Sequence, residues 1–398
     1  MTFLIKLVEH PLWLVGFRPF FALACLAGLS LPLWWVLVFT GAVPPVPRGF
    51  PSVTLTFVSP MQWHAHEMFY GFGWAALGGF LLTASKNWVG VRGWHGSALM
   101  LLAAAWVFDR LAMSLGAGWP PELFWLAHGL FQTAIVAMLL WTLFVQRVRE
   151  NNSDNYFFWI ILPLFLPAKF LIVQGDYFTL GWSMTLALFR VAFLIMLERT
   201  QVQFMRGAFK VDILRNPRLD LAIKWLAVVL VFGQLLPATL AGTLELILAL
   251  LLLTRFAGWF PRKAFTRIDI GIMYLGYLAI VAQLVISAVG RFADLPWIGS
   301  VSVHVFAVGV MGLILPAMIV RIAKGHTGRN VLFERADKLV LWIMLGGFIA
   351  RVIAPQLYPA GYTMWLHLAS TCWLSAFSLL LWRYLPFLMA PRADGRAH

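Results

Sequence analysis

Two histidines and a glutamate stand at the start of a long apolar segment. The stretch QWHAHEMFYGF, residues 62–72, places His64, His66 and Glu67 ahead of an apolar run that continues to about residue 84. Neutral histidine is the commonest metal ligand, and polar side chains at the mouth of a lipid-spanning segment need partners. The stretch therefore predicts a metal or cofactor site.

The spacing of these residues limits how they can bind. In a regular helix His64 and His66 point about 200° apart, so they cannot ligate one ion together, whereas His64 and Met68 stack at i, i+4. The stretch HVFAVGVMG, residues 304–312, places His304 and Met311 seven residues apart, on one helix face. Imidazole with thioether suits copper(I), and two axial histidines suit a b-type haem. Alternatively, Met68 and Met311 only pack against neighbouring helices.

The composition predicts that membrane helices position these residues. The 398 residues are 61% hydrophobic and 12% charged, with a mean hydropathy of +0.83, far from the soluble globular range. A spanning helix needs roughly 20 apolar residues. About twelve segments qualify: 12–39, 60–84, 97–115, 120–145, 156–174, 180–198, 221–236, 239–258, 269–290, 297–322, 337–354 and 362–385. The seventh is short and ends at Pro237. We predict an all-α, polytopic membrane bundle forming one domain, residues 1–398.

The distribution of Lys and Arg predicts the orientation. Alternate loops carry clusters such as Arg147 with Arg149 and Arg262 with Lys263, and the loops between them carry few. By the positive-inside rule both termini are cytoplasmic. The net charge of +14 then reflects topology and attraction to membrane lipid, so nucleic acid is not an expected partner. Two cysteines in apolar segments exclude a disulfide framework.

This topology assigns a depth to each histidine. His64, His66, His304, His128 and His367 all fall near the periplasmic ends of their segments. For His128 and His367 the alternative role is a hydrogen bond between helices. Glycines such as Gly78 and Gly79 after the first histidine pair would leave room for a flat cofactor, or would only let helices approach closely.

Several blocks along the whole chain carry a resemblance to a known family. They are GFRPFF at 16–21, WHAHEM at 63–68, GGFLLTASKNWVG at 78–90, HVFAVGVMG at 304–312, GHTGR at 325–329 and PRADG at 391–395. In these blocks the chain resembles the NnrS family of bacterial inner-membrane proteins, associated with nitric oxide and denitrification. The resemblance implies bound haem b and copper, nitric oxide or another small gas as a ligand, and an electron donor whose identity the sequence does not give.

The motifs separate into two layers. An interval of 22 residues separates His64 from Lys86 and His304 from His326, which at about 1.5 Å per residue is roughly 33 Å, about the hydrocarbon thickness. We therefore expect an outer metal site and a separate inner group. The outer site comprises His64, His66, His304, Met68 and Met311, and the inner cofactor-binding group comprises Arg18, Asn87, Trp88, Arg199, His326, Thr327 and Arg329. The inner group could hold an anion, a carboxylate or the propionates of a second haem, or it could simply clamp loops together.

Three functions remain open from the sequence. The first is a haem-binding and copper-binding protein that handles nitric oxide, with or without turnover. The second is a redox enzyme distantly related to haem-copper oxidases or nitric oxide reductases, but segments 180–198 and 221–236 lack the histidines that such a binuclear centre needs. The third is a transporter in which histidines carry protons. The sequence has no clear internal repeat of the kind that would support this function.

Overall fold

The molecule is built from helices. A computed structural model of the chain describes residues 8–44, 58–150, 153–213 and 215–396, and these ranges contain helical segments and no β-strand. Eleven helices in the described ranges are long and apolar enough to cross a membrane. The prediction of a polytopic all-α membrane protein is therefore confirmed.

The chain divides into two compact units. Unit 1 consists of Met1–Trp182, Ile319–Leu332 and Phe377–His398, and unit 2 consists of Ser183–Met318 and Phe333–Ala376. The division falls inside three long helices, α8 (Phe178–Phe209), α14 (Gly312–His326) and α17 (Tyr362–Met389). The prediction of one domain stays a prediction.

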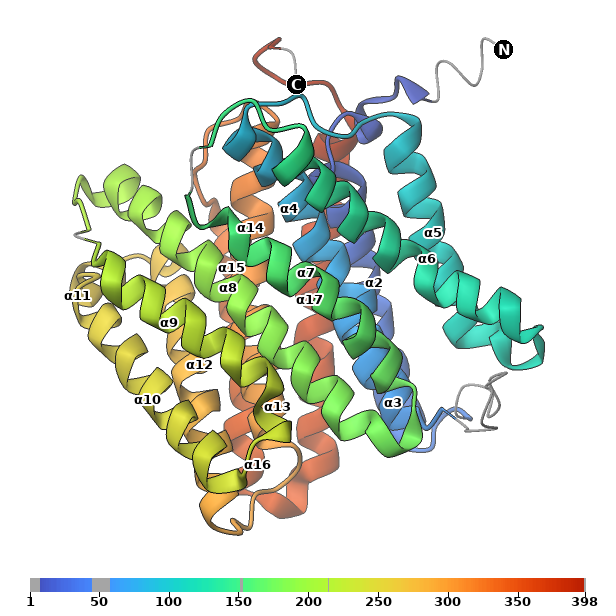
Figure 1. Cartoon of the computed structure of the whole chain (residues 1–398), viewed down its shortest axis with the longest axis vertical. Coiled ribbons are helices and arrows are strands. Elements are labelled where there is room, and N and C mark those ends of the chain that lie inside the picture. Colours follow the sequence, from blue (N-terminus) through green and yellow to red (C-terminus); the bar gives the residue numbers. More distant parts are fainter. Residues whose placement is uncertain (1–7, 45–57, 151–152, 214, 397–398) are drawn as a thin grey trace. The chain divides into compact units, whose positions relative to one another are not determined.

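Unit 1 contains the helix with the first histidine motif and its neighbours in the sequence (Figure 1). They are α2 (Phe17–Phe39), α3 (Pro60–His66), α4 (Trp74–Val89), α5 (Ser97–Leu115), α6 (Pro121–Leu140) and α7 (Tyr156–Ile172). Unit 2 contains α9 (Pro217–Val229), α10 (Ala238–Ala257), α11 (Pro261–Ala264), α12 (Ile268–Phe292), α13 (Val301–His304), α15 (Arg335–Phe348) and α16 (Ala354–Leu357).

Proline and polar caps set several helix starts. Pro60, Pro121 and Pro217 each stand at the first helical position, where the missing N–H costs no hydrogen bond. At α3, Ser59 and Gln62 also form a capping box, with Gln62 N to Ser59 Oγ at 3.2 Å and Ser59 N to Gln62 Oε1 at 2.8 Å. These signals fix where the first histidine motif enters its helix.

The seventh predicted span differs from the others. The region 221–236 forms α9, which has 13 residues, and then a 3₁₀ segment, Leu230–Leu235. Because α9 alone is shorter than the roughly 20 residues that a span needs, it is absent from the eleven candidate helices. In Figure 1, α8, α9 and α10 run side by side, with Lys224 of α9 bonded to Glu198 of α8.

Two π-helical segments follow the histidine motifs. One runs from Glu67 to Gly73, directly after His66, and the other from Val305 to Met311, directly after His304. In a π-helix each N–H bonds to the carbonyl five residues back, so the turn is wider than in an α-helix. The regular-helix spacing assumed for His64 with Met68 and for His304 with Met311 is therefore not present.

Candidate metal site in unit 1

A buried polar group links the first histidine motif to two neighbouring helices. His66 Nδ1 lies 2.9 Å from Glu67 Oε1, and Glu67 Oε2 lies 2.7 Å from Arg110 Nε of α5. Arg110 Nη2 also lies 2.8 Å from Asp109 Oδ2, which accepts from Lys169 Nζ of α7 at 2.5 Å. Charged residues are rare inside spans and usually pair with one another. The four charged side chains here form one continuous chain of ion pairs.

His128 of α6 completes the group. Its ring stacks on that of His66 with centroids 4.9 Å apart, and its Nδ1 lies 3.6 Å from Asp109 Oδ1. The backbone oxygen of His128 accepts a second hydrogen bond from Lys169. The potential ligand atoms of His66, Asp109 and His128 all lie within 4.8 Å of one another, and all three residues are buried.

These three side chains keep ligand atoms available. Because the Glu67 carboxylate only accepts, His66 Nδ1 donates to it, which leaves the unprotonated nitrogen at Nε2. The Nε2 atoms of both histidines and Oδ1 of Asp109 are buried without a hydrogen-bond partner. A buried polar atom without a partner costs free energy. Two imidazoles and one carboxylate form a donor set that suits copper, iron or zinc, so the residues fit a metal ion.

The charges of the group balance without an ion. Glu67 and Asp109 supply two negative charges, and Arg110 and Lys169 supply two positive charges. A bound cation would therefore add its whole charge to a buried site. Since burying net charge is costly, the balance favours a monovalent ion over a divalent one.

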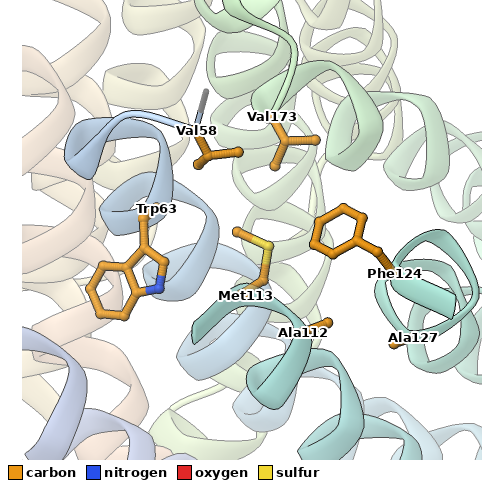
Figure 2. Close-up of a cluster of buried hydrophobic side chains, with 7 residues drawn as sticks. All are labelled: Val58, Trp63, Ala112, Met113, Phe124, Ala127 and Val173. Atoms are coloured by element: carbon orange, nitrogen blue, oxygen red, sulfur yellow. The ribbon is translucent and has the colours of Figure 1, made fainter. Parts of the chain in front are cut away.

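An apolar cluster covers the polar group at one end of the same helices. Figure 2 shows its seven members: Val58, Trp63, Ala112, Met113, Phe124, Ala127 and Val173. Five of them lie three or four residues from a member of the polar group: Trp63 from His66, Ala112 and Met113 from Asp109, Phe124 from His128 and Val173 from Lys169. Helices α3 and α6 begin near this cluster and α5 and α7 end near it. The cluster thus forms an apolar cap about one helical turn above the polar group.

The two histidines of WHAHEM have different neighbours. His64 stacks on Trp35 of α2, with centroids 4.3 Å apart and planes 13° apart, while His66 stacks on His128. His66 belongs to the group of potential metal ligands and His64 does not. Met68 lies half-buried in the π-helical segment.

His304 belongs to unit 2 and has protein partners there. Its Nδ1 lies 2.8 Å from the Ser300 carbonyl oxygen, so this nitrogen donates, and Arg351 Nη2 lies 3.1 Å from its Nε2. Met311 is buried in the same unit, at the end of the π-helical segment. Since His64 and His66 belong to unit 1, a haem shared between these motifs stays a prediction.

Sequence reasoning missed Asp109 and Lys169, and it treated His128 and His367 alike. His128 is buried in the polar group, whereas His367 of unit 2 is exposed. A signal for the missed residues was present, because Asp109 lies within the apolar segment 97–115 and Lys169 within 156–174. Intramembrane charges mark functional sites by default.

The inner group is built largely around the chain's C-terminal segment. Arg18 Nη1 donates to the carbonyl oxygens of Leu388 and Ala390, each at 2.7 Å. Thr327 accepts at its carbonyl oxygen from Ala393 N at 2.9 Å, and the Arg329 guanidinium lies 4.0 Å from the centroid of the Phe387 ring. Three sequence blocks, GFRPFF, GHTGR and PRADG, therefore meet in unit 1 and clamp the C-terminal segment.

PRADG adds its own contacts to this clamp. Arg392 Nη1 donates to the His326 carbonyl oxygen at 3.2 Å, and its Nε and Nη2 pair with Asp394 at 2.8 and 2.5 Å. Arg392 holds the pKa of the Asp394 carboxyl well below its usual range. Gly328 has φ +76°, and a Cβ there would lie 2.6 Å from Asp394 Cγ. The position thus requires glycine for its backbone and for the close approach.

The remaining predicted inner residues have other contacts. Asn87 Nδ2 donates to the Thr83 carbonyl oxygen at 3.4 Å, and Trp88 stacks on Phe158 with centroids 5.7 Å apart. Arg199 belongs to unit 2. The contacts of the clamp involve Arg18, His326, Thr327 and Arg329.

Comparison with known proteins is consistent with these motifs. No curated protein matches the chain. A family model described as "NnrS protein" matches residues 11–392, which includes the histidine motifs, GHTGR and the start of PRADG. Because this match covers nearly the whole chain, the protein belongs to the NnrS family.

Proposed function

We propose that this protein is a haem-binding and copper-binding protein of the bacterial inner membrane that takes part in nitric oxide handling, with a metal ion held by His66, Asp109 and His128. Membership of the NnrS family supports the link to nitric oxide. The observation that carries the metal assignment is the buried His66–Asp109–His128 group, in which the nitrogen and oxygen atoms suited to ligation have no hydrogen-bond partner.

The residues around the ligands prepare them for binding. Glu67 fixes the tautomer and orientation of His66, the role that a carboxylate beside a metal-bound histidine usually has. Arg110 in turn holds Glu67, and Arg110 and Lys169 occupy Asp109 Oδ2, so Oδ1 faces His128. A copper ion bound here would supply a redox-active centre that can bind a diatomic ligand.

The apolar cap controls what reaches the group. Trp63, Met113 and Phe124 are each at most 4% exposed, so the route through this end of the helices is closed to bulk water. Nitric oxide is small and apolar, so it can enter from lipid without a hydrated channel. Excluding water also strengthens the electrostatic interactions inside the site.

The proposal extends to haem at the predicted outer site. In unit 2, His304 would bind a b-type haem only after its Nε2 releases Arg351, and in unit 1 His64 is the histidine of WHAHEM that is not among the proposed ligands of the metal ion. The inner group around Arg18, His326 and Arg329 would bind a carboxylate or another anion. Three arginines of unit 1 lie there, and Asp394 supplies the one carboxylate that pairs with them.

Nitric oxide binding by the purified protein tests the proposal. Infrared spectra after addition of nitric oxide should show an N–O stretching band of a metal nitrosyl. His66→Ala should remove or shift the band assigned to the unit 1 site, and His367→Ala, a change at an exposed histidine of unit 2, should not. A wild-type protein loaded with metal that gives no nitrosyl band would refute the link to nitric oxide, and an unchanged spectrum in His66→Ala would refute the site.

A further inference from the structure

Arg190 is a buried cation of unit 2 to which the metal proposal assigns no role. Arg190 stands in the apolar interior of α8 and is 3% exposed. Its Nη1 donates to Gln283 Oε1 of α12 at 2.9 Å, and Gln283 Nε2 donates to Ser302 Oγ of α13 at 3.3 Å. Two neutral side chains thus hold the guanidinium in place.

No carboxylate pairs directly with this guanidinium. Among the described residues of unit 2, no Asp or Glu forms an ion pair with Arg190. Glu245 of α10 already accepts at Oε1 from Ser287 at 3.0 Å and at Oε2 from Arg291 at 3.2 Å. With Arg190 and Arg291 against Glu245, this part of unit 2 carries one excess positive charge. A buried charge without a counter-charge costs several kcal/mol.

The open edge of the guanidinium has the geometry for an anion. Arg190 Nε is buried without a hydrogen-bond partner, and the hydrogen bond from Arg190 to Gln283 uses only Nη1. The edge formed by Nε and Nη2 presents two parallel N–H groups, which match the two oxygens of a carboxylate or a similar planar anion. An anion there would accept a hydrogen bond from Nε and would neutralise the excess positive charge.

A polar stripe on α12 leads from the helix end toward this position. Gln283, Ser287 and Arg291 are spaced at i, i+4 and i+8, so they share one helix face. Arg291 is next to the last residue of α12, and its side chain is 15% exposed. The eight residues between Gln283 and Arg291 correspond to about 12 Å, and Arg291 would attract an anion at the outer end.

We propose that Arg190 binds a small, planar, monovalent oxyanion, of the size of nitrite, nitrate or formate, on its Nε–Nη2 edge, with Gln283 and Ser302 as positioning residues. The single excess charge sets the valence of the anion, and the closed surroundings of Arg190 limit its size. This site is independent of the metal site proposed for unit 1.

Thermal unfolding of the purified full-length protein tests the site. The buffer contains Hepes as its only other anion, and sodium nitrite, nitrate or formate is added at constant ionic strength. Saturating anion should raise the midpoint by about 3–6 °C with a saturable dependence on concentration, as expected when a ligand binds only the folded state.

Gln283→Glu is the decisive variant because it places a carboxylate beside Arg190 from within the chain. This variant should have a higher midpoint than wild type without added anion, and its response to anion should be lost. Gln203→Glu, the same change at an exposed position of α8, should respond like wild type.

Two results would overturn the proposal: a wild-type midpoint that does not respond to any of the three anions, or a full response in Gln283→Glu. If Gln283→Glu does not fold, Arg190→Lys replaces it, since lysine keeps the charge without the planar fork. The anion concentration for half-saturation should then increase at least tenfold, and an unchanged value would equally overturn the site.

Discussion

At the residue scale, the tautomer of His66 depends on one neighbouring carboxylate. Glu67→Gln keeps the size of the side chain but removes the charge that holds the Nδ1 proton and pairs with Arg110. We expect metal affinity to fall by about 10–100-fold, the usual effect of losing such a partner. Competition with a chelator of known affinity measures this.

The control for this change is Glu122→Gln, at an exposed glutamate in the first turn of α6. It should leave the affinity unchanged. If Glu67→Gln binds metal as tightly as wild type while the protein is folded, then His66 is not oriented by Glu67 and the proposed role of this pair is wrong.

Lys169 should weaken metal binding in the native protein, because its ammonium group touches the carboxylate of a proposed ligand. Two like charges about 4 Å apart repel by about 4 kcal/mol at an effective dielectric of 20. Lys169→Met should therefore tighten metal binding by at least about tenfold, which corresponds to 1.4 kcal/mol. Lys263→Met, at an exposed lysine of α11, is the control.

The same substitution should also lower stability, since removing one partner of a buried ion pair costs about 3–5 kcal/mol. Adding metal should raise the free energy of unfolding of Lys169→Met by more than it raises that of the wild type. Weaker metal binding by folded Lys169→Met would show that the ammonium group supports the site and does not compete with the ion.

Residue types alone identified part of this site. His66 and Glu67 are adjacent in the sequence, so their joint role could be predicted from one stretch. The partnership of His66 with Asp109 and His128 could not, because it depends on how α3, α5 and α6 pack. The intramembrane charges of Asp109 and Lys169 were visible as exceptions in apolar segments, and only the packing shows that they neutralise each other.

At the element scale, the C-terminal segment depends on a glycine in the loop after α14. Gly328→Ala would place a Cβ 2.6 Å from Asp394 Cγ, at a backbone φ of +76° that alanine rarely adopts. We expect the segment after Ala390 to detach and stability to fall by about 1–3 kcal/mol. Trypsin cleavage at Arg392, compared with wild type, measures the detachment.

Gly325→Ala is a matched control in the same motif. A Cβ there would meet only Val331 Cγ2, at 3.4 Å, and the residue precedes the strained position within helical backbone. It should leave cleavage at the wild-type rate. Equal rates for Gly328→Ala and wild type would show that the contact between GHTGR and PRADG does not hold the segment.

The helices were largely predictable, and their irregular turns were not. The lengths of the apolar segments in the sequence predicted all eleven candidate spans, because each segment is long and bounded by Pro, Gly or charged residues. The π-helical segments after His66 and His304 gave no comparable signal. They add room to one turn through backbone hydrogen bonding, which depends on neighbouring helices as well as on local propensity.

At the scale of the whole molecule, the number of crossings decides the orientation of the termini. Eleven crossings would place the termini on opposite sides, whereas the Lys and Arg distribution predicts both on the cytoplasmic side. The 13 residues of α9 and the six of the 3₁₀ segment after it, which kinks at Phe232, would together extend at most about 31 Å at 1.5 and 2.0 Å per residue, close to the hydrocarbon thickness. We therefore expect this region to be the twelfth crossing.

Reporter fusions test this topology. A fusion after Lys210 should report the cytoplasm, and fusions after Pro237 and near residue 296 should report the periplasm. If the fusions after Lys210 and Pro237 report the same side, α9 does not cross, and the prediction that both termini are cytoplasmic fails with it.

The central claim is that His66, Asp109 and His128 hold a metal ion, and metal content tests it most directly. Wild-type protein is purified from cells grown with copper and iron, and its metal content is measured by elemental mass spectrometry. It should contain one ion that is absent from both Asp109→Asn and His128→Ala. His367→Ala should keep the wild-type content, because His367 is exposed and belongs to unit 2. Wild-type metal content in folded Asp109→Asn and His128→Ala would contradict the claim.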